Sequence, residues 1–397
     1  MKLSISFQRF FESGKATGIL LIGCTVISMI LANSGLSAAY LGFWAHELGG
    51  LPLAEWINEA LMAVFFLHIG LELERELYVG ELSDRGSALL PVVAALGGAC
   101  VPALIHSLLN PGGPARAGAG IPMATDIAFA LGALALLGRR IPASLKIFLT
   151  ALAVMDDLAA MVVIAVFYTA HFSPGYLLGA LGVLAVLVVF NRVLHVMRLT
   201  PYLIGGVVLW FLMLRSGVHP TLAGVMLAFA IPFTGKGGPS AMPSHRLENA
   251  LHRPVALVVL PLFALANTAL VIDSDWMHGL LSSNGVGIAL GLVIGKPLGI
   301  TIAAVGAVAV GACRLPSDLG WRHIVGVGML GGIGFTMSIF ITNLAFGGNE
   351  PLIAASKMAI MLASATAGIL GYLWLRLLGG PEPAVEQPSA ERADLAA

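Results

Sequence analysis

Long apolar runs separated by short polar stretches follow one another along almost the whole chain. A membrane-spanning helix needs about 20 mostly apolar residues, because each residue adds about 1.5 Å along the helix axis. On this criterion the pattern predicts an all-α polytopic membrane protein with about twelve transmembrane helices. The predicted spans cover residues 16–33, 57–78, 87–109, 119–138, 143–170, 174–191, 199–214, 217–232, 250–272, 284–310, 321–345 and 352–378. Spans seven and eight are short and weakly separated, so eleven spans is the alternative.

Composition agrees with a protein whose surface meets lipid. Charged residues make up 11% of the chain and hydrophobic residues 58%, whereas about 25% of an ordinary soluble domain is charged. So few charges cannot cover a soluble protein of this size, which excludes the soluble, disordered and fibrous classes. The net charge is zero, with no basic stripe for nucleic acid and no GxxxxGK[ST] loop for a nucleotide. The three cysteines lie far apart in the sequence, and no cofactor is expected.

The basic residues predict the orientation of the chain in the membrane. With the N-terminus placed inside, all but four of the 21 lysines and arginines fall in loops on the inner side, as the positive-inside rule requires. Both termini are therefore expected in the cytoplasm. Residues 1–378 form one predicted transporter domain, which begins with an amphipathic interfacial helix at 1–15. A Pro-, Glu- and Ala-rich tail at 379–397 is expected to be disordered.

Four ionisable residues lie well away from the ends of predicted spans, where such side chains are costly and usually mark an ion or proton pathway. Asp126 belongs to span 4, Asp156 and Asp157 to the middle of span 5, and Lys296 to span 10. Neighbouring helix positions point about 100° apart, so one small polar pocket cannot hold both adjacent acids. A purely structural ion pair with Lys296 is one interpretation. We favour a mixture, in which one aspartate pairs with Lys296 and the other faces water.

Spans 4 and 11 contain helix-breaking sequences. Gly120 and Pro122 precede Thr125 and Asp126, and the run GVGMLGGIGFTMSIFITN in 326–343 is crowded with glycine. Close helix packing is one explanation, since glycine disfavours a helix by about 1 kcal/mol against alanine. The other is a pair of broken helices in corresponding positions of spans 3–5 and 10–12, which indicates an inverted-topology repeat with its site at mid-membrane. Asp126 and Lys296 would then neutralise the partial charges of the broken helix ends.

Carboxylates, a hydroxyl group and unwound backbone carbonyls are ligands for small, hard cations. Burial also favours the protonated form of a carboxyl group, so a cation and protons would compete for the same oxygens. Such competition at an alternately accessible site is antiport. A sodium-coupled solute symporter is the alternative, although only Asn267 and Asn343 stand out as polar groups for a solute. An intramembrane aspartyl protease is a third hypothesis, but its GxGD element is missing, and we do not expect an enzyme.

Several motifs resemble the bacterial NhaA-type sodium/proton antiporters. They include ATDIAFALG at 124–132, AVMDDLAA at 153–160, GKPLGI at 295–300 and GGIGFTMSIFI at 331–341, and the resemblance runs from about residue 10 to 378. It implies twelve helices in the inner membrane, with spans 4 and 11 unwound and crossing. It also implies electrogenic exchange of sodium or lithium ions for protons, and a homodimer formed through the loop after span 1. The implied ion- and proton-binding residues are Asp156 and Asp157, which bind the transported Na⁺, together with Thr125, Asp126 and Lys296. Asp157 is the one expected to face a cavity.

The resemblance further implies a pH-responsive cluster at the cytoplasmic funnel. The matching positions are Glu72, Arg75, Glu76, Glu248 and His252. Two residues depart from the family pattern, since Glu74 replaces a common lysine and Asn249 replaces a histidine. These departures put the expected pH profile in question more than the ion site.

Overall fold

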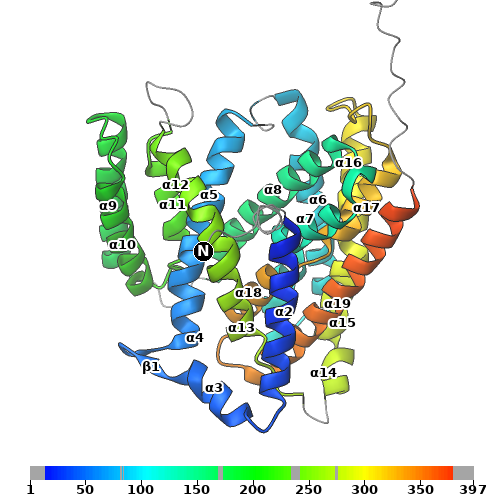
Figure 1. Ribbon diagram of the computed structural model, residues 1–397, viewed down its shortest axis with the longest axis horizontal. Coiled ribbons are helices and arrows are strands. Elements are labelled where there is room, and N and C mark those ends of the chain that lie inside the picture. The colour runs from blue at the N-terminus through cyan, green and yellow to red at the C-terminus, as the bar shows by residue number, and fades with distance from the viewer. Residues whose placement is uncertain are drawn as a thin grey trace, which may run out of the picture.

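A computed structural model describes residues 14–80, 83, 85–168, 173–233, 242–272 and 276–378 (Figure 1). Within this part of the chain helices dominate, and the one sheet is a short antiparallel hairpin of β1 (Glu47–Leu48) and β2 (Leu51–Pro52). The predicted all-α class is therefore confirmed. The predicted interfacial helix at 1–15 lies almost wholly outside the described residues, and the predicted tail at 379–397 lies entirely outside them.

The α-helices, 3₁₀-helices and π-helices alternate along the chain. In chain order they are α2 (Gly14–Ala32), α3 (Ser37–Ala45), α4 (Leu53–Trp56), the π-helix η1 (Ile57–Leu61), α5 (Met62–Tyr78), α6 (Arg85–Leu109), the 3₁₀-helix η3 (Pro114–Met123), α7 (Ile127–Leu136), the 3₁₀-helix η4 (Gly138–Arg140), α8 (Ala143–Phe167), α9 (Pro174–Arg192), α10 (Leu199–Ser216), α11 (Leu222–Ala230), α12 (Pro243–Pro254), the π-helix η6 (Val255–Val259), α13 (Leu260–Asn267), α14 (Trp276–Leu281), α15 (Ser283–Leu290), the π-helix η7 (Gly291–Gly295), α16 (Lys296–Ala309), α17 (Trp321–Gly331), α18 (Phe335–Ala345) and α19 (Glu350–Leu377). The irregular segments η1, η6 and η7 each lie inside a longer helical run. Such π segments often occur at functional positions.

The number of spans is close to the prediction. Eight helical runs among the described residues are long and apolar enough to cross a membrane, and the count rises to 11 if each of three bent pairs is one span. One predicted span, 217–232, contains only the nine-residue helix α11. Nine residues rise about 14 Å, which is too short to cross a bilayer, so this segment differs from the expected full span.

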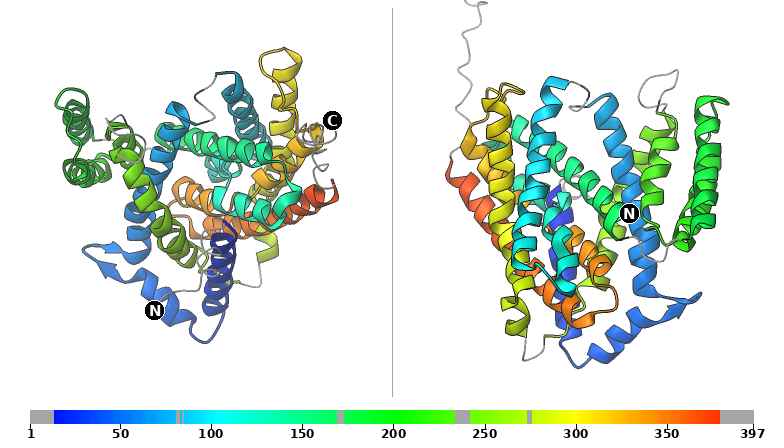
Figure 2. Two further views of the ribbon diagram at one scale, coloured as in Figure 1. Left: turned by 45° about the horizontal axis from the view of Figure 1, so that its top comes forward. Right: turned by 180° about the vertical axis from the view of Figure 1, so that it is seen from behind.

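Two of the bent pairs are the predicted broken helices. The η3/α7 pair is bent by 41° and the α17/α18 pair by 48°. Each pair lies between two long helical runs, with α6 and α8 around the first and α15–α16 and α19 around the second. This is the arrangement expected for corresponding positions of two repeats. Both breaks are buried, at residues 124–126 and 331–334, and the two broken helices lie among the other helices (Figure 2).

Small residues bring α6 and α16 together. A Cβ atom added to Gly97 would collide with the carbonyl oxygen of Gly299, and one added to Gly299 would collide with that of Gly97. Helices in membranes commonly approach at such small residues. Because Lys296 begins α16, this close contact helps to fix the lysine beside the broken helices.

Large apolar side chains cover the outside of the molecule. Helices α9 and α10 form a hairpin at one side (Figure 1) and are mostly unburied. Phe167, Leu178 and Val207 are each more than 60% exposed. Such a surface is stable against lipid hydrocarbon and not against water, which agrees with a multi-pass membrane protein.

Candidate functional site

The Asp126 carboxyl group holds the N-terminal ends of two half-helices. Its Oδ1 atom accepts a hydrogen bond of 3.1 Å from the backbone N–H of Phe129 in α7, and Asp126 is the N-cap of that helix. Its Oδ2 atom accepts one of 3.0 Å from the N–H of Thr336 in α18, and another from the Thr336 hydroxyl. Helix N-termini carry unsatisfied N–H groups and a partial positive charge. One carboxyl group therefore stabilises both breaks.

The C-terminal ends of the other two half-helices are held by donors. The Lys296 ammonium donates to the carbonyl of Met123, the last residue of η3. The Thr125 hydroxyl lies 2.8 Å from the carbonyl of Gly331, the last residue of α17. The extended chains also cross directly, since the Asp126 N–H donates a 2.6 Å bond to the Ile333 carbonyl. Carbonyl groups freed by the breaks thus receive a cation or a donor, as they must in a membrane interior.

Asp156 joins this crossing through one of its oxygens. Its Oδ2 atom lies 2.5 Å from the Lys296 Nζ atom and 2.6 Å from the Thr125 hydroxyl, while its Oδ1 atom has no hydrogen-bond partner. The structure therefore contains an ion pair between Asp156 and Lys296. The single Thr125 proton can be donated either to Asp156 or to Gly331, so the charge on Asp156 is linked to the capping of α17.

Asp157 is buried without a partner. Its side chain is 0% exposed, and neither carboxyl oxygen has a hydrogen bond. It lies within electrostatic range of Asp156, Asp126 and Lys296. The expectation that this residue faces water is not met, because helices enclose it in this conformation. A buried carboxyl group with two free oxygens is unstable unless a proton or a cation occupies it.

Replacing Lys296 by methionine should destabilise the protein by about 3–5 kcal/mol, because a buried charge would lose its partner. Thermal melting in detergent measures the loss. Adding Asp156→Asn to this variant should recover part of it, since the uncompensated charge is then also removed. An unchanged melting midpoint for Lys296→Met would contradict the importance of the pair.

Most of the predicted pH-response residues meet where the C-terminal part of α5 lies against α12. The Arg75 guanidinium lies 2.7 Å from the Glu76 carboxylate, 2.8 Å from that of Glu248 and 3.8 Å from that of Glu72. His252 is not among the ion pairs of Arg75, and its ring centroid lies 5.6 Å from that of His68. The predicted set thus divides into an arginine–glutamate cluster and a histidine pair.

Two cavities lie at this end of the molecule, and one of them reaches a broken helix. One of about 160 Å³ is lined by His68, Glu72 and His252 and also by Ile127, the residue that follows Asp126. Another of about 450 Å³ is lined by Arg75, Glu76 and Lys146. The first cavity places Glu72 beside the N-terminal part of α7.

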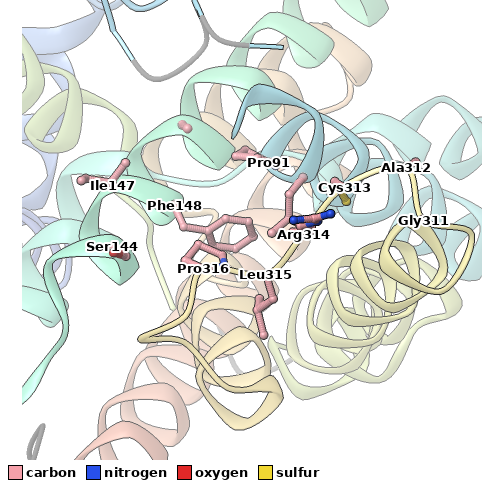
Figure 3. A pocket seen from close by; sticks show the side chains of 12 residues that line it. Pro91, Ser144, Ile147, Phe148, Gly311, Ala312, Cys313, Arg314, Leu315 and Pro316 are labelled. Carbon is pink, nitrogen blue, oxygen red and sulfur yellow. The ribbon is translucent and has the colours of Figure 1, made fainter. Parts of the chain in front are cut away.

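A larger cavity also lies beside α8. It has a volume of about 600 Å³ and is lined by α6, α8 and residues 311–316 (Figure 3). Its walls are mainly apolar, with Phe148, Leu315 and Pro316 among them, and it also holds the Arg314 side chain. An arginine and apolar walls do not suit a small cation, so we do not place the ion site there.

Comparison with known proteins gives the family. The family model described as Na+/H+ antiporter 1 matches residues 8–375. The chain is 64% identical over 374 residues to the Na(+)/H(+) antiporter NhaA of Dechloromonas aromatica, covering 94% of this chain and 96% of the relative. It is 55% identical over 377 residues to NhaA of Cytophaga hutchinsonii, covering 95% and 96% of the two chains. The chain belongs to the NhaA-type Na⁺/H⁺ antiporter family. Its activity is Na⁺/H⁺ exchange, and it is a transporter and not an enzyme.

Two residues that depart from the expected NhaA pattern are placed differently. Glu74 is buried on α5, and one of its oxygens has no hydrogen-bond partner. Asn249 lies on the exposed face of α12 and donates to the His245 carbonyl. Of the two departures, Glu74 is therefore the one that changes the buried interior of the protein.

Sequence reasoning did not identify Thr336 as the second partner of Asp126, or the carbonyls of Met123 and Gly331. Thr336 follows the glycine-rich break, and a hydroxyl residue at a new helix start is a recognisable signal. The two carbonyls carry no side-chain signal, because they depend on how the broken helices cross.

Proposed function

We propose that this NhaA-type antiporter exchanges Na⁺ or Li⁺ for a larger number of protons at Asp156 and Asp157, so that exchange is electrogenic. The observation that carries the proposal is Asp157, buried with two unpartnered oxygens one residue from the ion-paired Asp156. Protons occupy the carboxyl groups in the absence of Na⁺. A cation entering beside them favours the ionised form and displaces the protons.

The neighbouring contacts support a change of state on ion binding. When Na⁺ binds to Asp156 and Asp157, its positive charge weakens the ion pair between Asp156 and the Lys296 ammonium. The Thr125 proton is then shared differently between Asp156 and the Gly331 carbonyl. Asp126 and Thr125 each contact both broken helices. A change in charge at Asp156 therefore moves the half-helices of both pairs as rigid units. Alternating access requires such a coupling between the site and two discrete arrangements.

Everted membrane vesicles test the exchange. Addition of Na⁺ to vesicles with a preformed, acid-inside proton gradient should collapse the gradient, as reported by a pH-sensitive dye. Lowering the membrane potential should change the rate if exchange is electrogenic. The competing symporter hypothesis requires an organic solute for proton or sodium movement. Exchange that depends on such a solute would contradict the proposal.

We also propose that the Arg75 cluster sets the pH dependence of exchange. Of the three carboxylates around the Arg75 guanidinium, Glu72 and Glu76 lie on α5 with it, and Glu248 joins α5 to α12. Protonation of Glu248 weakens the contact between the two helices. Glu248→Gln should therefore shift the pH profile of exchange by about half a pH unit or more, since a pKa change of one unit corresponds to 1.36 kcal/mol. Proteoliposome assays from pH 6 to 9 measure the profile, with Glu350→Gln as a control. A superimposable profile would contradict this role.

The proposed location is the bacterial inner membrane, with lipid around the exposed helices and both termini in the cytoplasm. The Arg75 end then faces the cytoplasm and the β1–β2 hairpin faces outward.

We further propose a homodimer through this hairpin, where Leu48 is exposed and Trp56 donates a 2.8 Å hydrogen bond to the Leu48 carbonyl. Replacing residues 47–52 by a Gly-Ser linker should shift the protein to monomers in light scattering. A dimer that survives this change would contradict the assignment.

A further inference from the structure

One face of α18 connects the ion site to the hairpin end of the molecule. Thr336, Phe340 and Asn343 are separated by four and three residues, so they lie on the same side of the helix. Thr336 binds Asp126 at the site. Through Asn343 and Asn267 the same face is linked to Asn58 in η1, close to the hairpin in the chain.

Phe340 is packed against α5, α13 and the turn between α10 and α11. Its ring centroid lies 5.5 Å from that of Phe66, 6.4 Å from that of Phe263 and 5.8 Å from that of His219. Its side chain is 0% exposed. This aromatic contact excludes water between the site and the next turn of α18.

A chain of three amides lies one turn beyond Phe340. The side-chain amide of Asn343 donates a 2.6 Å hydrogen bond to the side-chain oxygen Oδ1 of Asn267. The side-chain amide of Asn267 in turn donates a 2.7 Å hydrogen bond to Oδ1 of Asn58. Asn267 also donates to the Phe263 carbonyl at 3.1 Å. We call Asn58, Asn267 and Asn343 the amide chain. It joins η1, the end of α13 and α18.

The amide chain crosses between two groups of helices. On one side, α13 is tied to α2 by the Ser28 hydroxyl, which donates to the Leu265 carbonyl at 2.7 Å. On the other side, α18 is tied to η3 by the Ser338 hydroxyl, which donates to the Ile121 carbonyl at 2.7 Å. Asn343 therefore belongs with the broken helices, and Asn267 belongs with α2 and α13.

We propose that Phe340 and the amide chain are the closed barrier on the hairpin side of the ion site, and that the Asn267–Asn343 contact separates in every transport cycle. The inference rests on the proposed alternating exchange at Asp156 and Asp157. In this conformation Phe340 is fully buried on the hairpin side of the site, and the cavities beside Glu72 and Arg75 lie at the opposite end. Opening toward the hairpin moves α18 away from α13, which exposes the Thr336 face to water.

A reversible cross-link tests the separation. Cys24, Cys100 and Cys313 are first replaced by alanine, and Asn267→Cys and Asn343→Cys are then introduced together. Oxidation with copper phenanthroline in proteoliposomes should form a disulfide and lower Na⁺/H⁺ exchange at least tenfold, and a reductant should restore it. The matched control is Asn33→Cys with Leu270→Cys, because Asn33 donates to the Leu270 carbonyl within one group of helices. Oxidation of the control should leave exchange unchanged.

The outcomes separate this inference from the proposed function. Full exchange by the oxidised Asn267→Cys/Asn343→Cys protein would overturn the barrier, as would failure of the disulfide to form in folded protein. Absence of Na⁺/H⁺ exchange in the unmodified protein would instead contradict the proposed function. A second variant needs no oxidation: Asn343→Ala should raise the KM for Na⁺ severalfold at the Arg75 face, because the conformation open there is less populated. Asn33→Ala should leave that KM unchanged, and an equal KM for both variants would also overturn the barrier.

Discussion

Asp157→Asn should abolish the proton movement that Na⁺ drives across the membrane. Asparagine keeps the size of the side chain but cannot exchange a proton for a cation. Every cycle needs that exchange at this position if Asp157 is the unpartnered acid of the site. The expected loss is at least 100-fold in the initial rate of dye response in everted vesicles.

Stability distinguishes a lost ion site from a lost fold in this variant. Removing a buried, unpartnered acid should leave the melting temperature unchanged or raise it, because the buried carboxyl group itself is destabilising. Asp318→Asn is the matched control, since Asp318 is exposed in the segment between α16 and α17. Exchange near the normal rate by folded Asp157→Asn protein would rule out the assigned role.

Asp126→Ala should lower the free energy of unfolding by on the order of 3 kcal/mol. The variant loses the N-cap of α7 and the acceptor at the start of α18, and one N-cap is worth about 1 kcal/mol. Hydrogen bonds to a charged group add about 1.5–3 kcal/mol each, although not additively. Chemical denaturation in detergent measures the change.

Exchange should fall together with stability in Asp126→Ala, because the two half-helices then lose their common anchor beside Asp156. Thr336→Val provides a graded comparison, since it removes the hydroxyl contact to Asp126 but keeps the backbone N–H. Its loss of stability should be about half as large or less. Equal effects of the two substitutions would show that the second half-helix, and not the shared carboxyl group, determines the stability of the crossing.

Much of the fold could be predicted from the sequence. Membrane spans depend on the length of local apolar runs, and the side of the membrane on which each loop lies depends on the distribution of basic residues. The broken helices were also foreseeable, since Pro122 and the glycines near Gly331 disfavour a regular helix. The short helix α11 was harder to predict. Its apolar run continues to residue 232, and hydropathy alone does not indicate where a helix ends.

The contacts within the site could be predicted only in part. The rarity of charges in spans pointed to Asp126, Asp156, Asp157 and Lys296. The hypothesis that one of the two adjacent aspartates pairs with Lys296 agrees with the observed 2.5 Å contact of Asp156. The enclosure of Asp157 could not be foreseen, because it depends on which conformation the helices adopt. The amide chain was missed for a similar reason. Asn58, Asn267 and Asn343 are far apart in sequence, and only the packing of η1, α13 and α18 brings them together.

The most direct test of the central claim is the affinity of the purified protein for Na⁺ as a function of pH, measured by isothermal titration calorimetry in detergent. If Na⁺ and protons compete for Asp156 and Asp157, the Kd should rise about tenfold per pH unit for each proton displaced as the solution becomes acidic. Na⁺ binding should also release protons into a weakly buffered solution. The Asp156→Asn/Asp157→Asn double variant should show neither binding nor release. A Kd independent of pH from 6 to 9, or Na⁺ binding that survives in the double variant, would contradict the account.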